Sequence, residues 1–431
     1  MYKRQELDRS LPEESDASPA SILSINYGVD SETFSQEFRL TGATEKLDWL
    51  AGAFYLEEDI NQNQTVDLFR SFRQFTGGLS DPTGSITGAP VFFARVLNDQ
   101  NLETLALYGQ GNYQLNDKLA LTFGLRYTDE SRNFDVRAQV EEPSEVGIEI
   151  TPAYAFNGLE TSSDALSYRS AIEYKASNTS LIYGSVSRGF KSGGFNGGFL
   201  DLDLDQARRQ LEPYDPEFLT AYEVGFKSDF LDSRLRVNAA IFYNDFKDLQ
   251  VFSQINSGDL PLLVLDNASN AESSGIEIDV SAILAEGLTF NVNATFIDSE
   301  LKDFVSEDTG EDFSGNRIAQ TPETSVSAIL AYERGVFNGG KLKAQTSLAY
   351  KDDLFFTTEN NPLVGQEAYT LMNARLGYTI PSETWTLTAF INNLTDERYK
   401  TNVSDIRDIT ASYVNTYGLP RTYGVEVSFN F

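Results

Sequence analysis

Apolar and polar residues alternate along most of this chain, in runs of about ten residues. In residues 119–127 the odd-numbered positions are large and apolar, whereas Thr122, Gly124 and Arg126 lie between them. Residues 276–284 and 288–296 repeat this pattern. Since successive side chains of a strand point to opposite faces, the pattern predicts β-strands with one apolar face and one hydrated face.

Alternation fits both a soluble sandwich and a membrane barrel, but the connections between the strands favour the barrel. The sequence predicts about fifteen strands, which begin near Phe34, Leu47, Glu103, Lys118, Leu166, Thr179, Glu217, Arg234, Ala271, Gly287, Thr324, Gly340, Tyr369, Thr384 and Arg421. Short turns alternate with long segments, at residues 61–101, 130–164, 190–216, 247–270, 299–321, 352–367 and 393–420. Tight periplasmic turns and long extracellular loops are typical of outer-membrane barrels. We therefore expect an all-β fold, an antiparallel up-and-down transmembrane β-barrel.

The arrangement of the chain ends predicts that this barrel is truncated at its N-terminus. The last strand runs from a long loop to the periplasmic end, so counting back makes residues 1–33 an extracellular loop remnant and residues 34–431 the barrel. An odd number of strands does not close a single-chain bacterial barrel, because these barrels use even counts. Residues 7–16 also have acids and Pro where a secretory signal has its apolar core. We therefore expect the first strands to be missing.

The composition excludes several functional classes. The chain has no Cys and no His, which removes disulfide scaffolds, thiol nucleophiles, Cys/His zinc sites and imidazole-based catalytic triads. Its net charge of −31 argues against nucleic-acid binding, because neutralising phosphates requires clustered Lys and Arg. No stretch approaches the roughly 18 consecutive apolar residues of a membrane helix, so any span consists of strands. We expect no enzyme activity, no cofactor and no metal site.

The C-terminal strand is the most specific local feature of the sequence. Small or polar residues alternate there with Tyr423, Val425, Val427, Phe429 and Phe431. A strand that ends abruptly on Phe, without a polar tail, is uncommon in soluble domains, whose last residues are usually poorly ordered. We favour a functional C-terminus over the alternative, an ordinary amphipathic strand at a chain end.

Four motifs, in order along the chain, resemble those of TonB-dependent outer-membrane receptors. They are residues 187–196 (SRGFKSGGFN), 216–227 (PE followed by YEVGFK), 391–399 (INNLTDERY, with Thr395 where the family often has Phe) and 418–424 (GLPRTYG). The resemblance covers residues 34–431 and implies a barrel of about 22 strands plugged from within. It also implies that the terminal Phe belongs to a signal read by the barrel-assembly machinery. We find neither a plug nor a TonB box, and expect both to be missing.

The Gly-rich stretch at residues 189–198 is the candidate solute-binding segment. It lacks the Gly-Lys-Ser/Thr ending of a phosphate-binding loop, and no predicted helix follows it. We consider it a substrate-facing or gating loop, whose candidate contact residues are Arg188, Phe190, Lys191, Phe195 and Asn196. The competing interpretation is that Gly and Phe let the loop fold back over the barrel. Glu223 and Lys227, on the wet face of one strand, are predicted to form an ion pair of the wall.

Taken together, these patterns predict an outer-membrane receptor and transporter of a Gram-negative bacterium. By family resemblance the solute is an iron–siderophore complex or another scarce nutrient, taken up with energy from the TonB complex, which acts through the missing N-terminal part. The other expected partners are the barrel-assembly machinery and the lipid and lipopolysaccharide of the outer membrane. The alternatives are a passive porin-like channel, which needs no plug, and a secreted β-rich adhesin or binding protein, which stays soluble without detergent.

Overall fold

The computed structural model is dominated by one large antiparallel β-sheet. It describes residues 2–14, 23–69, 92–144, 147–197, 204–257, 260–306, 310–336, 339–405, 407 and 412–430. Within these ranges the main sheet has sixteen strands in sequence order. They are β1 (Tyr2–Glu14), β2 (Leu23–Ala43), β3 (Leu47–Leu68), β4 (Phe92–Asn116), β5 (Leu119–Ser144), β6 (Gly147–Lys175), β7 (Ser180–Lys191), β8 (Glu217–Phe230), β9 (Leu235–Ser257), β10 (Leu260–Ala285), β11 (Leu288–Asp303), β12 (Thr324–Val336), β13 (Gly340–Lys351), β16 (Tyr369–Thr379), β17 (Trp385–Asn392) and β20 (Thr422–Phe429).

The remaining described elements are short and lie in the connections. They are α1 (Leu204–Gln210), the hairpin of β14 (Leu354–Phe355) and β15 (Gly365–Gln366), the 3-10 turn η2 (Pro362–Val364), and the hairpin of β18 (Lys400–Asp405) and β19 (Tyr413–Tyr417). Among the described residues, no helix is long and apolar enough to cross a membrane.

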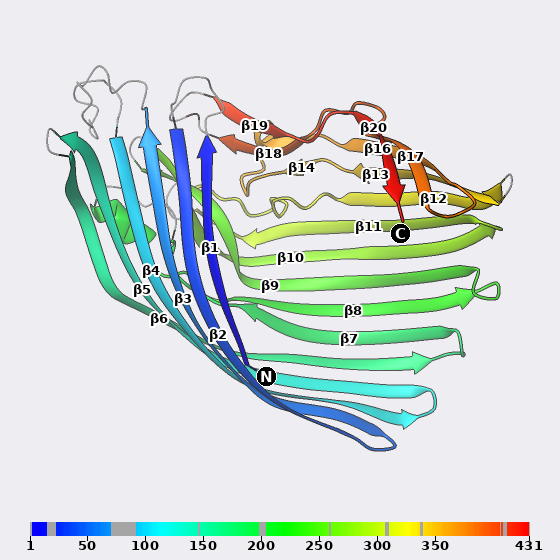
Figure 1. The fold of residues 1–431 in the computed structure, drawn as a ribbon. Helices are drawn as coiled ribbons and strands as arrows, with labels where there is room; N and C mark the ends of the chain where they lie inside the picture. The colour runs from blue at the N-terminus through cyan, green and yellow to red at the C-terminus, as the bar shows by residue number, and fades with distance from the viewer. Residues whose placement is uncertain are drawn as a thin grey trace.

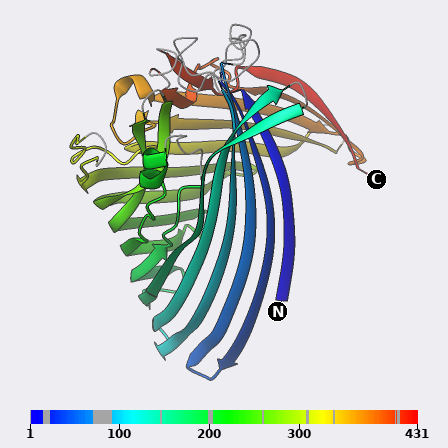
Figure 2. The ribbon, with the colours of Figure 1, turned by 90° about the vertical axis from the view of Figure 1, so that its left-hand side faces the viewer.

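The main sheet is strongly curved. In Figure 1 the strands β1–β6 rise on the left of the view, whereas β7–β13 run across it. Figure 2, turned by 90°, shows the curvature of the first strands in side view. Every strand is antiparallel to its neighbours, so the predicted all-β, up-and-down architecture is confirmed. β1 and β20 are the two ends of the sheet, and no pairing between described residues joins them, so the sheet is not closed.

All fifteen predicted strands are present, and the sheet has one more. The additional strand is β1, which pairs with β2 from Tyr2 opposite Gln36 to Glu14 opposite Ser24. The prediction that residues 1–33 form a loop is therefore wrong in its secondary structure for residues 2–14 and 23–33. Residues 2–14 lack apolar alternation, so their strand is held by backbone pairing. Backbone pairing cannot be recognised from the order of side chains in the sequence. Their extracellular location stays a prediction.

The described residues of three predicted long loops are mostly continuations of strands. β5 and β6 stay paired out to Ser144 and Gly147, and β9 and β10 stay paired out to Ser257 and Leu260. β3 likewise continues to Leu68. Pairing satisfies the backbone groups of these long hairpins, and buried hydrophobic clusters lie on them. The hairpins extend the sheet far beyond the strand lengths that the sequence predicted.

The large apolar side chains of the strands are exposed on one face of the sheet, which we call the outer face. Phe38 is 70% exposed, and Val224 and Ile241 are each 62% exposed. The opposite, inner face carries polar side chains. It also carries apolar side chains that are buried where the connection between β7 and β8 packs against the sheet. A soluble sandwich would enclose the apolar set in a dry core, so this exposure excludes that architecture.

On the inner face, Tyr183 lies flat against a glycine of the neighbouring strand. It pairs with Gly225 of β8, and a Cβ at position 225 would overlap the tyrosine ring. The Tyr183 hydroxyl donates a hydrogen bond of 2.5 Å to Glu223, and the Lys227 ammonium lies 5.4 Å from the ring centroid. Instead of the predicted ion pair, Glu223 and Lys227 therefore share Tyr183 as a partner.

Candidate functional site

The connection between β7 and β8 folds onto the inner face of the sheet. Its described residues, 192–197 and 204–216, are called the β7–β8 segment below. Gly194 and Tyr214 form an isolated β-bridge, with N–H to carbonyl distances of 3.0 and 2.9 Å. The bridge holds the two ends of the segment together, and α1 lies between them in sequence.

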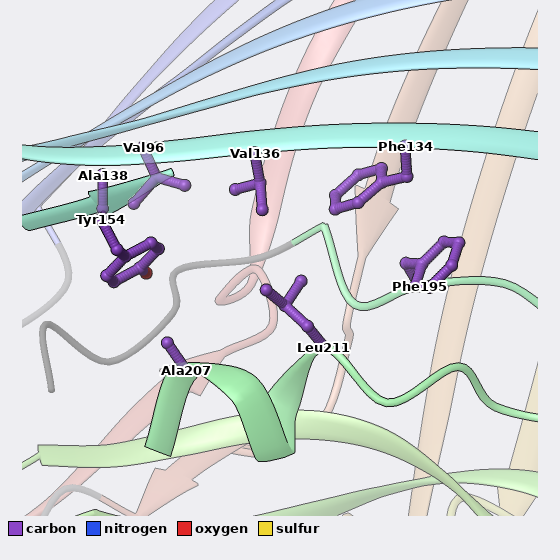
Figure 3. Close-up of a cluster of buried hydrophobic side chains, with 8 residues drawn as sticks. All are labelled: Val96, Phe134, Val136, Ala138, Tyr154, Phe195, Ala207 and Leu211. Atoms are coloured by element: carbon purple, nitrogen blue, oxygen red, sulfur yellow. The ribbon is translucent and has the colours of Figure 1, made fainter. Parts of the chain in front are cut away.

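The first attachment of the β7–β8 segment is apolar and is drawn in Figure 3. The Phe195 ring stacks on the Phe134 ring of β5, with centroids 5.3 Å apart and planes 14° apart. Ala207 and Leu211 pack into the same cluster, against inner-face residues that include Val136. Phe195 is only 6% exposed, and burial of such a side chain contributes about 1.5–3 kcal/mol. The inner face of β5 therefore holds the segment by hydrophobic contact.

The second attachment is made by Asn196, which binds β10 as a paired strand would. Its Oδ1 accepts a hydrogen bond of 2.7 Å from the Leu265 N–H, and its Nδ2 donates to the Leu265 carbonyl at 3.2 Å. The same Nδ2 also donates a hydrogen bond of 3.2 Å to the carbonyl of Gln210, the last residue of α1. One side-chain amide thus joins both the wall and the helix.

The third attachment holds the base of the β7–β8 segment to β9 and β10. The Gln250 Nε2 donates to the carbonyls of Ser192, at 2.9 Å, and Asp215, at 3.1 Å. Asn267 accepts from the Asp215 N–H at 2.7 Å and donates to the Asp215 carbonyl at 3.0 Å. Because the other attachments are to β5 and β10, the segment spans the inner face between two distant parts of the sheet.

A partly buried ion pair lies under the bridge. Arg132 Nη2 is 3.2 Å from Glu130 Oε1, and the two side chains are 17% and 12% exposed. Gly194 passes so close that a Cβ there would lie 2.8 Å from Arg132 Nη1, so a larger residue would displace the end of the Arg132 side chain. Burial raises the pKa of the Tyr214 phenol, and the charge of Arg132 opposes that change. The segment therefore shields charged groups of the inner wall from water.

A cavity of about 370 Å³ lies between the β7–β8 segment and β10. Its lining includes Asn196, Gln206, Arg209, Tyr214, Asp266 and Asn267. Amide, guanidinium, phenol and carboxylate groups together offer hydrogen-bond donors and acceptors to a polar solute. Among the described residues, no group of three or more Asp or Glu side chains is arranged to hold a metal ion.

The five predicted solute-contact residues lie on different faces. Phe195 and Asn196 both belong to the β7–β8 segment and hold it in place. Arg188 and Phe190 are on β7, at alternate positions that point to the outer face. Lys191 is the exposed last residue of β7. The structure thus brings Phe195 and Asn196 together in one segment. A role of any of the five residues in solute binding stays a prediction.

Sequence reasoning missed the residues that receive the segment. A local signal existed for Phe134 alone, because residues 134–140 (FDVRAQV) continue the alternation of β5. Gln250 and Asn267 fall in a stretch that was predicted as a loop, and their partners lie far away in the sequence. Only the fold reveals such long-range hydrogen bonds.

The C-terminal strand has the predicted alternation within the described residues. Tyr423 is 81% exposed, Val425 66% and Val427 61%, all on the outer face of β20. Phe429 follows on the same face, and its ring centroid lies 4.7 Å from that of a tryptophan of β17. Phe431 lies outside the described residues. Recognition of this strand by the barrel-assembly machinery stays a prediction.

A family model described as TonB dependent receptor-like, beta-barrel, matches residues 2–394. The chain belongs to the TonB-dependent receptor family. The pesticin receptor of Yersinia pestis is 24% identical over 331 residues, covering 76% of this chain and 44% of the relative. The probable TonB-dependent siderophore receptor PiuA of Acinetobacter baumannii is 24% identical over 429 residues, covering 94% of this chain and 53% of the relative. The chain thus spans about half the length of these curated relatives.

Solved structures show the same fold. The ferric yersiniabactin uptake receptor FyuA from Yersinia pestis has a TM-score of 0.75 at 20% identity, over 100% of this chain and 58% of its own. The siderophore receptor PiuA from Acinetobacter baumannii has a TM-score of 0.68 at 22% identity, over 99% of this chain and 61% of its own. TonB-dependent receptors are outer-membrane proteins of Gram-negative bacteria, and they are receptors and transporters, not enzymes. The predicted outer-membrane location of this receptor chain is therefore confirmed.

Proposed function

We propose that this chain forms most of the barrel of a receptor that takes up an iron–siderophore complex with energy supplied through TonB. The observation that carries the proposal is the β7–β8 segment, which is attached at both sides of the inner face and borders a polar cavity. The names of PiuA, a siderophore receptor, and FyuA, a ferric yersiniabactin uptake receptor, support the choice of solute.

The two faces of the sheet support a transport path on the inner side. An apolar outer face fits hydrocarbon, whereas the polar inner face offers hydrogen bonds to a hydrated, oxygen-rich chelate. An open sheet in lipid would leave the edges of β1 and β20 with unpaired backbone groups, each costing several kcal/mol. We therefore propose that the complete receptor closes this sheet into a barrel around the solute path.

The proposal is tested by uptake of radioactive iron with the complete receptor in a strain that lacks its other siderophore receptors. A panel of purified iron–siderophore complexes is supplied to isogenic strains with and without TonB. We expect uptake of at least one complex in the TonB-containing strain and its loss in the other. Equal uptake in both strains would identify a passive channel, the alternative that the family membership disfavours. No uptake of any iron complex would refute the choice of solute.

A further inference from the structure

Two basic and two aromatic side chains form a cluster on the outer face, which we call the β7–β9 outer patch: Arg188, Phe190, Phe218 and Lys247. Phe190 of β7 pairs with Phe218 of β8, which in turn pairs with Lys247 of β9. The Arg188 guanidinium carbon lies 4.5 Å from the Phe218 ring centroid, and the two phenylalanine rings lie 6.3 Å apart. Three adjacent strands thus supply one patch.

The register places this patch on the outer face, whose exposed apolar side chains fit hydrocarbon. Side chains on one face recur at every second residue of a strand. Arg188 therefore points to the same side as Ile182, which is 43% exposed, and β7 has no register shift between them. Phe218 likewise shares the side of Tyr222 and Val224, which are 49% and 62% exposed. The patch therefore faces away from the solute path.

The patch also lies at the edge of the apolar band. Tyr222 pairs with Tyr243, with ring centroids 6.2 Å apart, and tyrosines are typical of the membrane–water interface. Phe218 precedes Tyr222 by four residues in β8, roughly 13 Å at about 3.3 Å per residue. It therefore lies nearer to the β7–β8 segment, at the end of the sheet that has the long connections. Arg188 is paired between these two levels, opposite Thr220. Because interfacial tyrosine rings sit at the level of the lipid head groups, a patch next to them is within reach of those head groups.

The two cations of the patch have no acidic partner. Neither Arg188 nor Lys247 forms an ion pair with a described residue, although the chain has 64 acidic and 33 basic residues. The Arg188 Nε is buried and has no hydrogen-bond partner among the described residues. The nearest carboxylates in the register, Asp245 and Glu272, share the face but pair with neither cation. A guanidinium held on an aromatic ring, with no carboxylate paired to it among the described residues, suits a phosphate.

We propose that the β7–β9 outer patch binds a phosphate group of an outer-leaflet lipid. The guanidinium and the ammonium contact the phosphate, and the acyl chains lie along the apolar band next to Tyr222 and Val224. The phenylalanine rings hold the guanidinium at the interface and keep water from it. This inference rests on the outer-membrane location of the family and not on the proposed uptake of a siderophore.

The test uses the complete receptor, purified and delipidated in a neutral detergent. It is titrated with phosphorylated lipopolysaccharide, with the same lipid after enzymatic removal of its phosphates, and with inorganic phosphate. We expect the phosphorylated lipid to bind about tenfold more tightly than the dephosphorylated lipid, since each 1.4 kcal/mol is a factor of about ten in affinity. Inorganic phosphate alone is expected to bind far more weakly.

The variants compare this patch with a similar arrangement on the inner face. Arg188→Gln together with Lys247→Gln should abolish the preference for the phosphorylated lipid. Arg126→Gln is the matched control, because Arg126 lies 5.6 Å from the ring centroid of Tyr108 but points to the inner face, and it should keep the preference.

Three results would overturn the proposal. They are equal binding of the two lipids to the unaltered receptor, an unchanged preference in the double variant, and inorganic phosphate binding as tightly as the lipid. The first comparison needs no variant, so it remains decisive even if a substitution disturbs folding.

Discussion

Replacing Phe195 with alanine should release the β7–β8 segment from the inner face while leaving the sheet intact. Phe195 is 6% exposed, and its ring stacks on Phe134 within a cluster that also contains Leu211 from the turn after α1. Phe→Ala substitutions in cores cost about 3–5 kcal/mol. We take the lower end, about 3 kcal/mol, because a connection can relax into the space that is left.

Amide hydrogen exchange of the complete receptor, followed by mass spectrometry, measures this effect directly. A loss of about 3 kcal/mol in the free energy of local opening corresponds to roughly 100-fold faster exchange. This acceleration is expected in peptides that cover residues 204–216, whereas peptides from the β5 and β8 strands should exchange at the original rate. The matched control is Phe123→Ala, on the outer face of the same strand as Phe134, where Phe123 is 56% exposed.

Two outcomes would refute the reasoning. Exchange of residues 204–216 within twofold of the unaltered receptor would show that the Phe195 contact does not hold the segment. Equal acceleration in the Phe123→Ala control would show that the effect comes from general destabilisation of the sheet. Faster exchange throughout the sheet in the Phe195→Ala variant would likewise contradict the expectation that Phe195 stabilises only the β7–β8 segment.

Three further predictions follow from the packing. Gly225→Ala should displace the Tyr183 ring and lower the thermal unfolding temperature, with a loss of about 1–3 kcal/mol; Gly189→Ala is the control, because a Cβ at Gly189 meets nothing within 4 Å, and equal shifts for both variants would contradict the close contact. Asn196→Leu removes the hydrogen bonds to Leu265 and should speed proteolysis of the β7–β8 segment about tenfold, as expected from a loss of 1–3 kcal/mol; an unchanged cleavage rate would argue against this attachment. Removal of detergent should aggregate the purified chain, because its outer face is apolar; a soluble monomer in sedimentation would contradict the lipid-facing assignment.

Much of the sheet could be predicted from the sequence because side-chain direction in a strand has a period of two. Leu107 and Val224 had to lie on one face and Glu223 on the other, whatever their neighbours were. The same argument explains why all fifteen predicted strands appear in the sheet. β1 escaped prediction because its residues have no apolar face, so its pairing with β2 left no trace in the pattern.

The candidate site could be predicted only in part. The Gly-rich motif led to the β7–β8 connection, and Phe195 and Asn196 do hold it. The outward direction of Arg188 required knowing that β7 continues without a bulge to Lys191. The placement of one residue therefore depended on where a strand ends, which local sequence defines poorly.

The sequence by itself determined the strands, their two faces and the family, since each depends on local order and residue type. Only the tertiary structure decided that β1 joins the sheet, that long hairpins replace loops, and that Gln250 and Phe134 receive the β7–β8 segment. These features depend on contacts between residues far apart in the chain. Their free energy comes from pairing and burial that exist only once the sheet has curved and brought its distant strands together.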